Sequence, residues 1–259
     1  MDNSILVKEQ SQMKRKPPTV LSPSLAARFG AVAMGAVFAQ ALALPATAAP
    51  APGDVIDFTD YRSGPVDAWL RAKGFVFERD AKDKSSVEYK ADARGLEVSA
   101  LRPAHGLLVN RTAGGKAYSG IEIEWGVSKH PEGASYEKKV NNEAIMVQVI
   151  FGTEKKSSGS AFAPDIPYFV GLFLCKGDRT GHAYSGRYYQ EGGRYVCLNN
   201  APPAGQAVVS RYNLKEGVRA AFGDNVGGAV TGYSIGVDTS SSTGEGKSSA
   251  FIKRIRFVS

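Results

Sequence analysis

The chain has very little cysteine: Cys175 and Cys197 are its only two cysteines in 259 residues, and they do not form a Cys-x-x-Cys pair. No cysteine lies next to the N-terminal apolar run either. The sequence therefore gives no support for a dithiol redox enzyme, a zinc site or a lipoprotein anchor. Two outcomes remain open for the pair. It forms a disulfide if the protein works in an oxidising compartment, or it stays as two buried free thiols that pack as small hydrophobes.

Histidine and several catalytic motifs are also scarce or missing. His105, His130 and His182 are the only histidines, and no two of them have the spacing of metal ligands. The sequence contains no G-x-S-x-G nucleophile elbow and no glycine-rich phosphate loop between a strand and a helix, which argues against an α/β-hydrolase and a nucleotide-binding enzyme. We expect no metal centre and no organic cofactor.

The first 48 residues have the order of a secretory signal peptide. Basic residues at 14–16 and 28 precede the uncharged apolar run Phe29–Leu44, and Pro45 and Ala46–Ala48 follow it. A membrane-spanning helix needs about 20 apolar residues, so this run is short for a span, and no later run is longer. We therefore expect cleavage before Ala49, a periplasmic or secreted protein, and no transmembrane segment.

Charge argues against a nucleic-acid partner. The first 48 residues contain five of the 32 basic and two of the 25 acidic residues, so the formal net charge falls from +7 for the whole chain to +4 for residues 49–259. After residue 48, no Lys/Arg run is longer than a pair. A nucleic-acid-binding surface is typically a dense basic patch.

Residues 49–259 are dominated by short segments of period two, separated by Gly, Asn, Ser and Pro. We expect a single all-β domain, an antiparallel β-sandwich of jelly-roll, galactose-binding-like or concanavalin-like type. The expected strands are Val55–Phe58, Phe75–Asp80, Val87–Ala91, Leu96–Leu101, Leu107–Arg111, Ile121–Val127, Ala144–Phe151, Tyr168–Cys175, Arg187–Gln190, Arg194–Leu198, Ala207–Tyr212, Tyr233–Asp238 and Phe251–Val258.

Two of these strands and two helices have distinctive patterns. Ile145–Phe151 and Tyr168–Leu174 are apolar at nearly every position, which is typical of central strands covered on both faces. A helix is expected at Pro65–Lys73, with Ser63 as a capping residue. A second helix is expected at Leu214–Phe222, where Asn213 and the Glu three residues later resemble a capping box.

Glu122 and Glu124 are the sharpest candidates for catalysis. Alternation places both on one face of their strand, with Trp125 on the other, and puts their Cα atoms about 7 Å apart. Glycosidases use carboxyl pairs at about 5–9.5 Å. The alternative is a solvated strand face, with Arg254 and Arg256 of the last strand as ion-pair partners.

An aromatic and basic cluster around the turn at residues 190–193 is the candidate ligand-binding site. Tyrosine rings stack on the apolar faces of sugars and guanidinium groups bind hydroxyls or carboxylates, so this composition suits a glycan. The alternative is an ordinary hairpin rich in strand-forming residues. The candidate residues are Trp125, Tyr184, Arg187, Tyr188, Tyr189 and Arg194.

A structural calcium ion is a further option. Asp54, Asp57 and Asp60 are closely spaced, and Asp238 lies at the end of an expected strand before the Ser/Gly/Thr-rich loop Thr239–Ser249. Calcium is held by oxygen ligands of this kind, although such sites have no fixed sequence pattern when they are built from loops.

The order of these segments resembles a family of exported bacterial proteins known only as a domain of unknown function. The resemblance lies in the Trp-bearing strand Ile121–Val127, the apolar strand 144–152, the helix that ends in Phe-Gly at 222–223, and the Val237-Asp238-Thr239 segment before the last strand. It implies export and a jelly-roll-like sandwich; the family has no established activity, so the resemblance adds nothing about catalysis. Relatives carry a second Trp in place of Ile123 and acidic residues in place of 141 and 142.

Three functions are consistent with this sequence. The first is an exported, non-catalytic module that binds carbohydrate or another cell-envelope polymer. The second is a glycan hydrolase or polysaccharide lyase that uses Glu122 and Glu124. The third is a structural envelope protein whose partner is another protein. An enzyme requires both carboxylates in a cleft, with the pKa of one raised by burial or by its neighbour.

Overall fold

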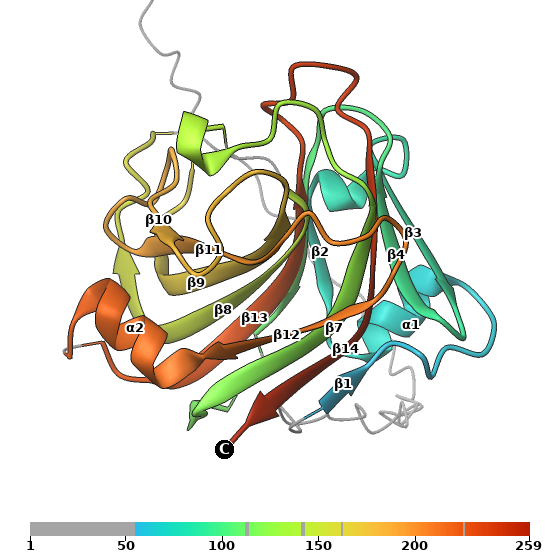
Figure 1. Cartoon of the computed structure of the whole chain (residues 1–259). Coiled ribbons are helices and arrows are strands. Elements are labelled where there is room, and N and C mark those ends of the chain that lie inside the picture. The colour runs from blue at the N-terminus through green and yellow to red at the C-terminus, as the bar shows by residue number, and fades with distance from the viewer. Residues whose placement is uncertain (1–54, 112–113, 141–142, 162, 225) are drawn as a thin grey trace, which may run out of the picture. The chain divides into compact units, whose positions relative to one another are not determined.

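The computed structural model describes residues 55–111, 114–140, 143–161, 163–224 and 226–259. The expected signal peptide, Asp54 and residues 141 and 142 lie outside these ranges. The described residues form two β-sheets that pack face to face, with a helix against each of two edges (Figure 1).

Sheet A is antiparallel throughout. Its strands follow the order β12-β7-β14-β4-β3, and β1 pairs with β14. The bounds are β1 Val55–Asp57, β3 Val87–Asp92, β4 Gly95–Ala100, β7 Gly120–Lys129, β12 Val208–Asn213 and β14 Ser248–Val258.

Sheet B has the order β10-β11-β9-β8-β13-β5-β2, and β6 pairs with β13. Its pairs are antiparallel except β9 with β11, which is parallel. The bounds are β2 Val76–Arg79, β5 His105–Asn110, β6 Lys116–Ala117, β8 Glu143–Lys156, β9 Ile166–Cys175, β10 Ala183–Tyr184, β11 Gly193–Asn200 and β13 Ala229–Asp238.

The core lies between the inner faces of the two sheets. Trp125 and Ile123 of β7 and Ile252 of β14 come from sheet A, and Val147 of β8 and Ile235 of β13 come from sheet B; all are buried. Alternation therefore leaves one outer face on each sheet. The outer face of sheet B carries the cleft described below.

The expectation of an all-β sandwich is confirmed, with one departure from the antiparallel pattern. The expected hairpin with Arg187–Gln190 as a strand is wrong: β11 runs parallel to β9, and residues 187–190 form a loop. The expected tight turn at residues 190–193 would reverse the chain and produce an antiparallel pair. The 17-residue connection from β9 to β11, which contains β10, instead allows β11 to run in the same direction as β9.

Strand β9, and β8 as far as Val147, are covered on both faces, as their continuous apolar sequence predicts, whereas Gln148 and Ile150 farther along β8 line the cleft described below. Val147 and Leu172 face the core, while Met146, Phe169 and Phe173 belong to a second buried cluster on the outer face of sheet B. That second cluster forms part of the floor and end of the cleft.

Both expected helices are present, as α1 Val66–Ala72 and α2 Leu214–Phe222. The Asn213 side chain accepts a hydrogen bond from the backbone N–H of Glu216 at 3.0 Å, so the expected cap on α2 is confirmed. Ser63 does not cap α1: the residue at its N-terminus is Pro65, without a side-chain cap. None of the described helices is long and apolar enough to cross a membrane.

Candidate functional site

A cleft of about 460 Å³ lies on the outer face of sheet B. Its floor follows the central strands β5, β13 and β8, and its walls come from β2, from the segment 164–167 and from Tyr189. The residues of the floor are Leu107, Val109, Met146, Gln148, Ile150, Gly232 and Ser234. The small residues on β13 leave the middle of the sheet uncovered, which gives the cleft its depth.

Three polar residues form a row across the floor at one end of the cleft. Asp238 on β13 is directly opposite His105 on β5 and directly opposite Glu143 on β8. Directly opposed residues in antiparallel strands lie about 4.5–5.5 Å apart at Cα. Nδ1 of His105 and Oδ2 of Asp238 are 3.9 Å apart. The sheet thus places an imidazole, a carboxylate and a carboxyl side by side.

An irregularity in β8 brings Glu143 into this row. Gly236 pairs with Met146, but two residues later Asp238 pairs with Glu143, three residues from Met146. The extra residue is a β-bulge. Ala144 and Ile145 therefore both lie in the core between the sheets, and Glu143 lines the cleft with Met146. Bulges of this kind commonly re-aim a side chain beside a functional site.

Glu143 is a buried acid that favours its protonated form. The residue is 2% exposed, and its Oε1 has no hydrogen-bond partner among the described residues. Burial raises the pKa of Glu143 well above its usual value of 4.5, and the negative charges of Asp238 and Asp178 raise it further. Asp238 is partly accessible: its side chain is 17% exposed, and its Oδ1 accepts the backbone N–H and the hydroxyl of Ser240.

Burial also determines the protonation states of two groups next to the acids, the imidazole of His105 and the phenol of Tyr195. Burial lowers the pKa of His105, although the nearby Asp238 opposes this effect, so the imidazole favours its neutral form. Burial raises the pKa of Tyr195 well above 10, so its hydroxyl stays protonated. The end of the cleft therefore combines a protonated carboxyl with a neutral imidazole and a phenol.

Tyr136 closes the same end of the cleft. It lies in the short 3₁₀ helix Tyr136–Lys138, is 5% exposed, and its hydroxyl has no hydrogen-bond partner among the described residues. Its ring packs against Phe173 and Tyr195 at centroid distances of 4.7 and 5.1 Å. Two buried polar atoms, one on Glu143 and one on Tyr136, thus remain unsatisfied at this end.

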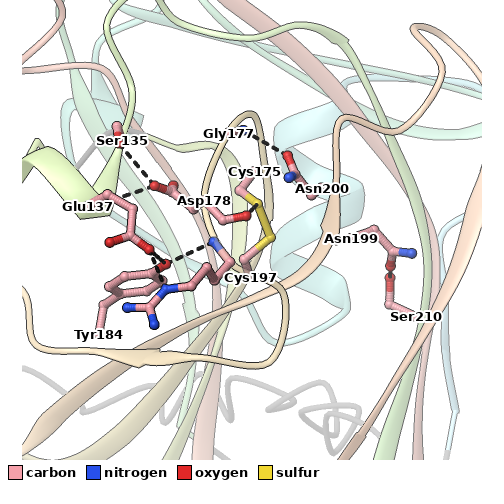
Figure 2. The surroundings of a disulfide bond; sticks show 11 residues. Ser135, Glu137, Cys175, Gly177, Asp178, Tyr184, Cys197, Asn199, Asn200 and Ser210 are labelled. Atoms are coloured by element: carbon pink, nitrogen blue, oxygen red, sulfur yellow. Dashed lines mark hydrogen bonds and ion pairs between the residues drawn. A yellow bond between two sulfur atoms is a disulfide. The ribbon is translucent and has the colours of Figure 1, made fainter.

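A disulfide between Cys175 and Cys197 fixes the support behind this end (Figure 2). Asp178, in the turn after Cys175, accepts hydrogen bonds from the Ser135 hydroxyl and the Glu137 backbone N–H on either side of Tyr136. Glu137 also accepts bonds from Tyr184 and Arg179. The bonded cysteines and these contacts hold the 3₁₀ helix over the sheet.

Glu122 and Glu124 lie on the outer face of sheet A, away from this cleft. Glu122 is paired with Arg211 at 2.7 Å and with Arg256 at 3.2 Å, and Glu124 is paired with Lys253 at 3.3 Å. Of the two expected partners, Arg256 pairs as anticipated, whereas the closest acidic group to Arg254 is Asp57. The arrangement is a solvated strand face with charge pairs, and the pair is not placed in a cleft.

Of the six expected ligand-binding residues, the cleft contains Tyr189 alone. Trp125 is fully buried in the core, and Tyr184 is buried behind the cleft end. Arg187, Tyr188 and Arg194 lie outside the cleft lining: the guanidinium of Arg187 lies over the Tyr188 ring, and that of Arg194 lies over Phe222. A hairpin would have placed the side chains of residues 187–194 along two paired strands. Residues 187–190 form a loop instead, so these side chains lie apart from one another.

A second cavity, of about 570 Å³, lies against β3, β4 and β14. Most of its charged side chains are already paired, including Asp92 with Arg94 at 2.7 Å and Lys253 with Glu124 at 3.3 Å, while Glu97 accepts hydrogen bonds from Ser99 and Ser249. Among its described lining residues, the hydroxyl of Tyr89 is the single buried polar side-chain atom without a hydrogen-bond partner, whereas the first cleft has two such atoms at one end. We therefore take the cleft on sheet B as the candidate site.

The carboxylates considered for calcium have other partners. Asp57 accepts two hydrogen bonds from Thr59, Asp60 pairs with Lys73 at 2.6 Å, and Asp238 lies in the cleft. In the part of the chain that the structure describes, no three His, Cys, Asp or Glu side chains are grouped so as to hold a metal ion.

Sequence reasoning missed Glu143 and Tyr136 and did not connect His105 with Asp238. Period-two counting from Met146 places Glu143 on the core side, where a charged residue is not expected, and only the bulge reverses this. A usable signal was present: Glu143 comes immediately before a run of eight residues with little polarity, 144–151. Burying an acid there costs free energy, so a glutamate at this position is a candidate for a functional role.

No protein-family model and no curated protein matches this chain. Among solved structures the chain is similar to an agarase, AgWH50C, with a TM-score of 0.30 and 10% sequence identity. The alignment covers 79% of this chain and 24% of the agarase chain, so the present chain spans about a quarter of the length of that enzyme. A similarity at this level assigns neither a family nor an activity.

Proposed function

We propose that this protein binds a carbohydrate chain in the cleft on the outer face of sheet B. The observation that carries the proposal is a pair of buried, unsatisfied polar atoms, Glu143 Oε1 and the Tyr136 hydroxyl, on two residues that line one end of the cleft. Leaving such a group without a partner costs about 1–3 kcal/mol. The hydroxyl groups of a sugar both donate and accept hydrogen bonds and would satisfy both atoms.

The dimensions of the cleft support a ligand of several sugar units. Its floor follows β13 from Thr231 to Asp238, seven residue steps, or about 23 Å at 3.3 Å per residue. Its volume of about 460 Å³ is within the usual range for ligand pockets, about 300–1,000 Å³. Tyr189 presents a ring at one wall, and Gln148 and Ser234 offer an amide and a hydroxyl on the floor.

The charge of the lining favours a neutral glycan over a polyanion. Arg111 is already paired with Glu78 at 2.6 Å. With Glu143 protonated and His105 neutral, the charged side chains of the lining cancel: Arg79, Arg111 and Lys155 against Glu78, Asp165 and Asp238. A site for a uronate polymer would require an excess of cations.

We also propose that the protein is exported to the periplasm or secreted. The leader at residues 1–48 and the Cys175–Cys197 disulfide both support an oxidising location, since structural disulfides are rare in the cytosol. Fractionation of the host should recover from the periplasm a protein whose N-terminal sequence begins at Ala49. An intact Met1 on membrane-bound protein would contradict this.

A glycan array probed with the purified full chain tests the binding proposal. Two neighbouring tyrosines provide a matched pair: Tyr189 lines the cleft, whereas Tyr188 is 42% exposed and lies outside the lining. We expect binding to neutral glycans that falls about tenfold in Tyr189→Ala, because stacking of a ligand ring on an aromatic side chain contributes about 1–3 kcal/mol per base in proteins that bind single-stranded nucleic acid. Tyr188→Ala should bind like the original protein.

Salt and stability complete the test. Binding to an uncharged glycan should change less than about twofold between 50 and 500 mM NaCl, because screening acts on charge–charge attraction. Thermal unfolding of both variants separates lost binding from lost folding. Absence of binding to every glycan would contradict the proposal and favour a structural envelope protein with a protein partner.

A further inference from the structure

We infer that Glu143 and Asp238 are an acid and nucleophile pair that hydrolyses the glycosidic bond of the carbohydrate held in the cleft. This inference rests on the proposed function and adds catalysis to it. The two residues lie directly opposite each other on β8 and β13 and both line the cleft.

The register of the pair places the two acids side by side, which bears on the two geometries of glycoside hydrolysis. Directly opposed antiparallel residues lie about 4.5–5.5 Å apart at Cα. Enzymes that retain the configuration of the sugar hold their two carboxyl groups about 5–5.5 Å apart, whereas inverting enzymes leave about 6.5–9.5 Å for a water molecule. The pairing puts the two side chains next to each other on one face of the sheet, the arrangement that the shorter, retaining separation requires.

The environments of the two acids assign their roles. Burial and the negative charge of Asp238 raise the pKa of Glu143, so Glu143 holds a proton that it can donate. Asp238 is the more exposed of the two, and Ser240 fixes its Oδ1. Its Oδ2 accepts no hydrogen bond from the described residues; the neutral His105 lies 3.9 Å away. Oδ2 is the free nucleophilic atom.

An independent observation at this same end of the cleft supports the inference. The hydroxyl of Tyr136 is buried, lines the cleft and has no hydrogen-bond partner among the described residues. Tyr136 is on a separate segment from the acids and does not depend on their pairing. A sugar hydroxyl above the acid pair would satisfy it, which positions the sugar where the reaction requires it.

In the first step, Asp238 Oδ2 attacks the anomeric carbon and forms an ester bond to it. The bond from that carbon to the glycosidic oxygen breaks, its electron pair goes to the oxygen, and the oxygen takes the proton of Glu143. The negative charge of Asp238 is thereby removed, so one of the causes that raise the pKa of Glu143 disappears. Glu143 is then more stable as a carboxylate and can act as a base.

In the second step, Glu143 takes a proton from water as the water oxygen attacks the anomeric carbon. The ester bond breaks, and its electron pair returns to Asp238. Glu143 is again protonated and Asp238 again ionised. One glycosidic bond and one water are consumed, two sugar hydroxyls are produced, and two displacements retain the configuration.

Hydrolysis and binding are measured together on the purified full chain. The probes are laminarin, xylan, soluble starch and agarose oligosaccharides, with reducing ends as the measure of hydrolysis and calorimetry as the measure of binding. We expect Glu143→Gln and Asp238→Asn to lose about 10²–10⁴-fold in rate, with the dissociation constant changed less than about threefold. Glu124→Gln, an acid on the other sheet, is the matched control and should keep both.

The outcomes separate the two proposals. Binding without release of reducing ends by the original protein overturns the inference and leaves the proposed function intact. Absence of binding to all four probes and to every glycan of the array overturns both. Because Asp238 also holds Ser240, Asp238→Ala is assayed with added sodium azide, whose anion replaces the missing nucleophile; restored cleavage supports the role of Asp238. A folded variant that azide does not restore contradicts it.

Discussion

The hydroxyl of Ser210, on β12 of sheet A, donates a hydrogen bond at 2.5 Å to Oδ1 of Asn199, on β11 of sheet B (Figure 2). The same hydroxyl accepts the indole N–H of Trp125 at 2.8 Å. These contacts join the edges of the two sheets and satisfy the polar atom of the largest side chain in the core.

Substitution of Ser210 should therefore destabilise the sandwich. Ser210→Ala leaves the buried indole N–H without an acceptor, and we expect a loss of about 1–3 kcal/mol in the free energy of unfolding. Urea unfolding followed by tryptophan fluorescence measures it. Val209→Thr, at a half-exposed position on the same strand, should stay within about 0.5 kcal/mol of the original protein. Equal losses in the two variants would show that the hydrogen bonds contribute nothing specific.

The disulfide should contribute substantially to stability. Cys175 and Cys197 close a loop of 22 residues, which corresponds to about 3 kcal/mol in the chain-entropy model. Replacing both cysteines by alanine should lower the melting temperature by about 6–12 °C. A reducing agent should lower the melting temperature of the original protein to the same extent and leave the double variant unchanged. An unchanged melting temperature after reduction would argue against the bond.

Glu143 should make stability depend on pH in a defined direction. Its pKa is raised in the folded protein, so the folded state binds the proton more tightly than the unfolded chain does. This contribution is complete below the usual Glu pKa of 4.5 and is lost as pH rises through the folded-state pKa, by about 1.4 kcal/mol per pH unit. The ionisable side chains of His105, Asp238, Asp178 and Tyr195 lie nearby and are present in both proteins that we compare.

Glu143→Gln removes this dependence. We expect the variant to be more stable than the original protein at pH 7 and the difference to shrink toward pH 4, as measured by urea unfolding at several pH values. Glu122→Gln, on the solvated face of sheet A, should follow the original protein across the whole range. A difference that is constant with pH would mean that Glu143 is ionised in the folded protein.

The carboxylates of sheet A should have little effect on stability or binding. Glu122→Gln and Glu124→Gln each remove partly exposed ion pairs, which contribute about 0–1 kcal/mol. The loss should diminish in 0.5 M NaCl because salt screens such pairs. Loss of glycan binding in either variant would mean that Glu122 and Glu124 belong to the functional site.

Local patterning predicts most of this fold. Alternation at residues 121–127 correctly separates the core-facing Trp125 from Glu122 and Glu124, and the cap at Asn213 correctly marks the start of α2. Each expected strand except Arg187–Gln190 overlaps a strand of the structure. These features depend on neighbours in the sequence, which is why the sequence reveals them.

The candidate site depends on pairing between distant segments, which the sequence does not display. His105, Asp238 and Glu143 meet because β5, β13 and β8 are neighbours in sheet B. Tyr188 and Tyr189 are adjacent in sequence, yet a positive φ of 58° at Tyr189 turns its ring toward Phe169 and the cleft. Nothing local distinguishes the two tyrosines.

The bulge in β8 makes the location of Glu143 a matter of chain length as much as of residue type. Deleting Ala144 would keep Glu143, Met146 and every other side chain of the strand, but would restore regular alternation between Gly236 and Asp238. Glu143 would then stand two positions from Met146, so it would remain opposite Asp238 and on the cleft face. A homologue that lacks one residue here can therefore keep the glutamate in the cleft without a bulge, whereas a strand of unchanged length that paired regularly would turn it toward the core.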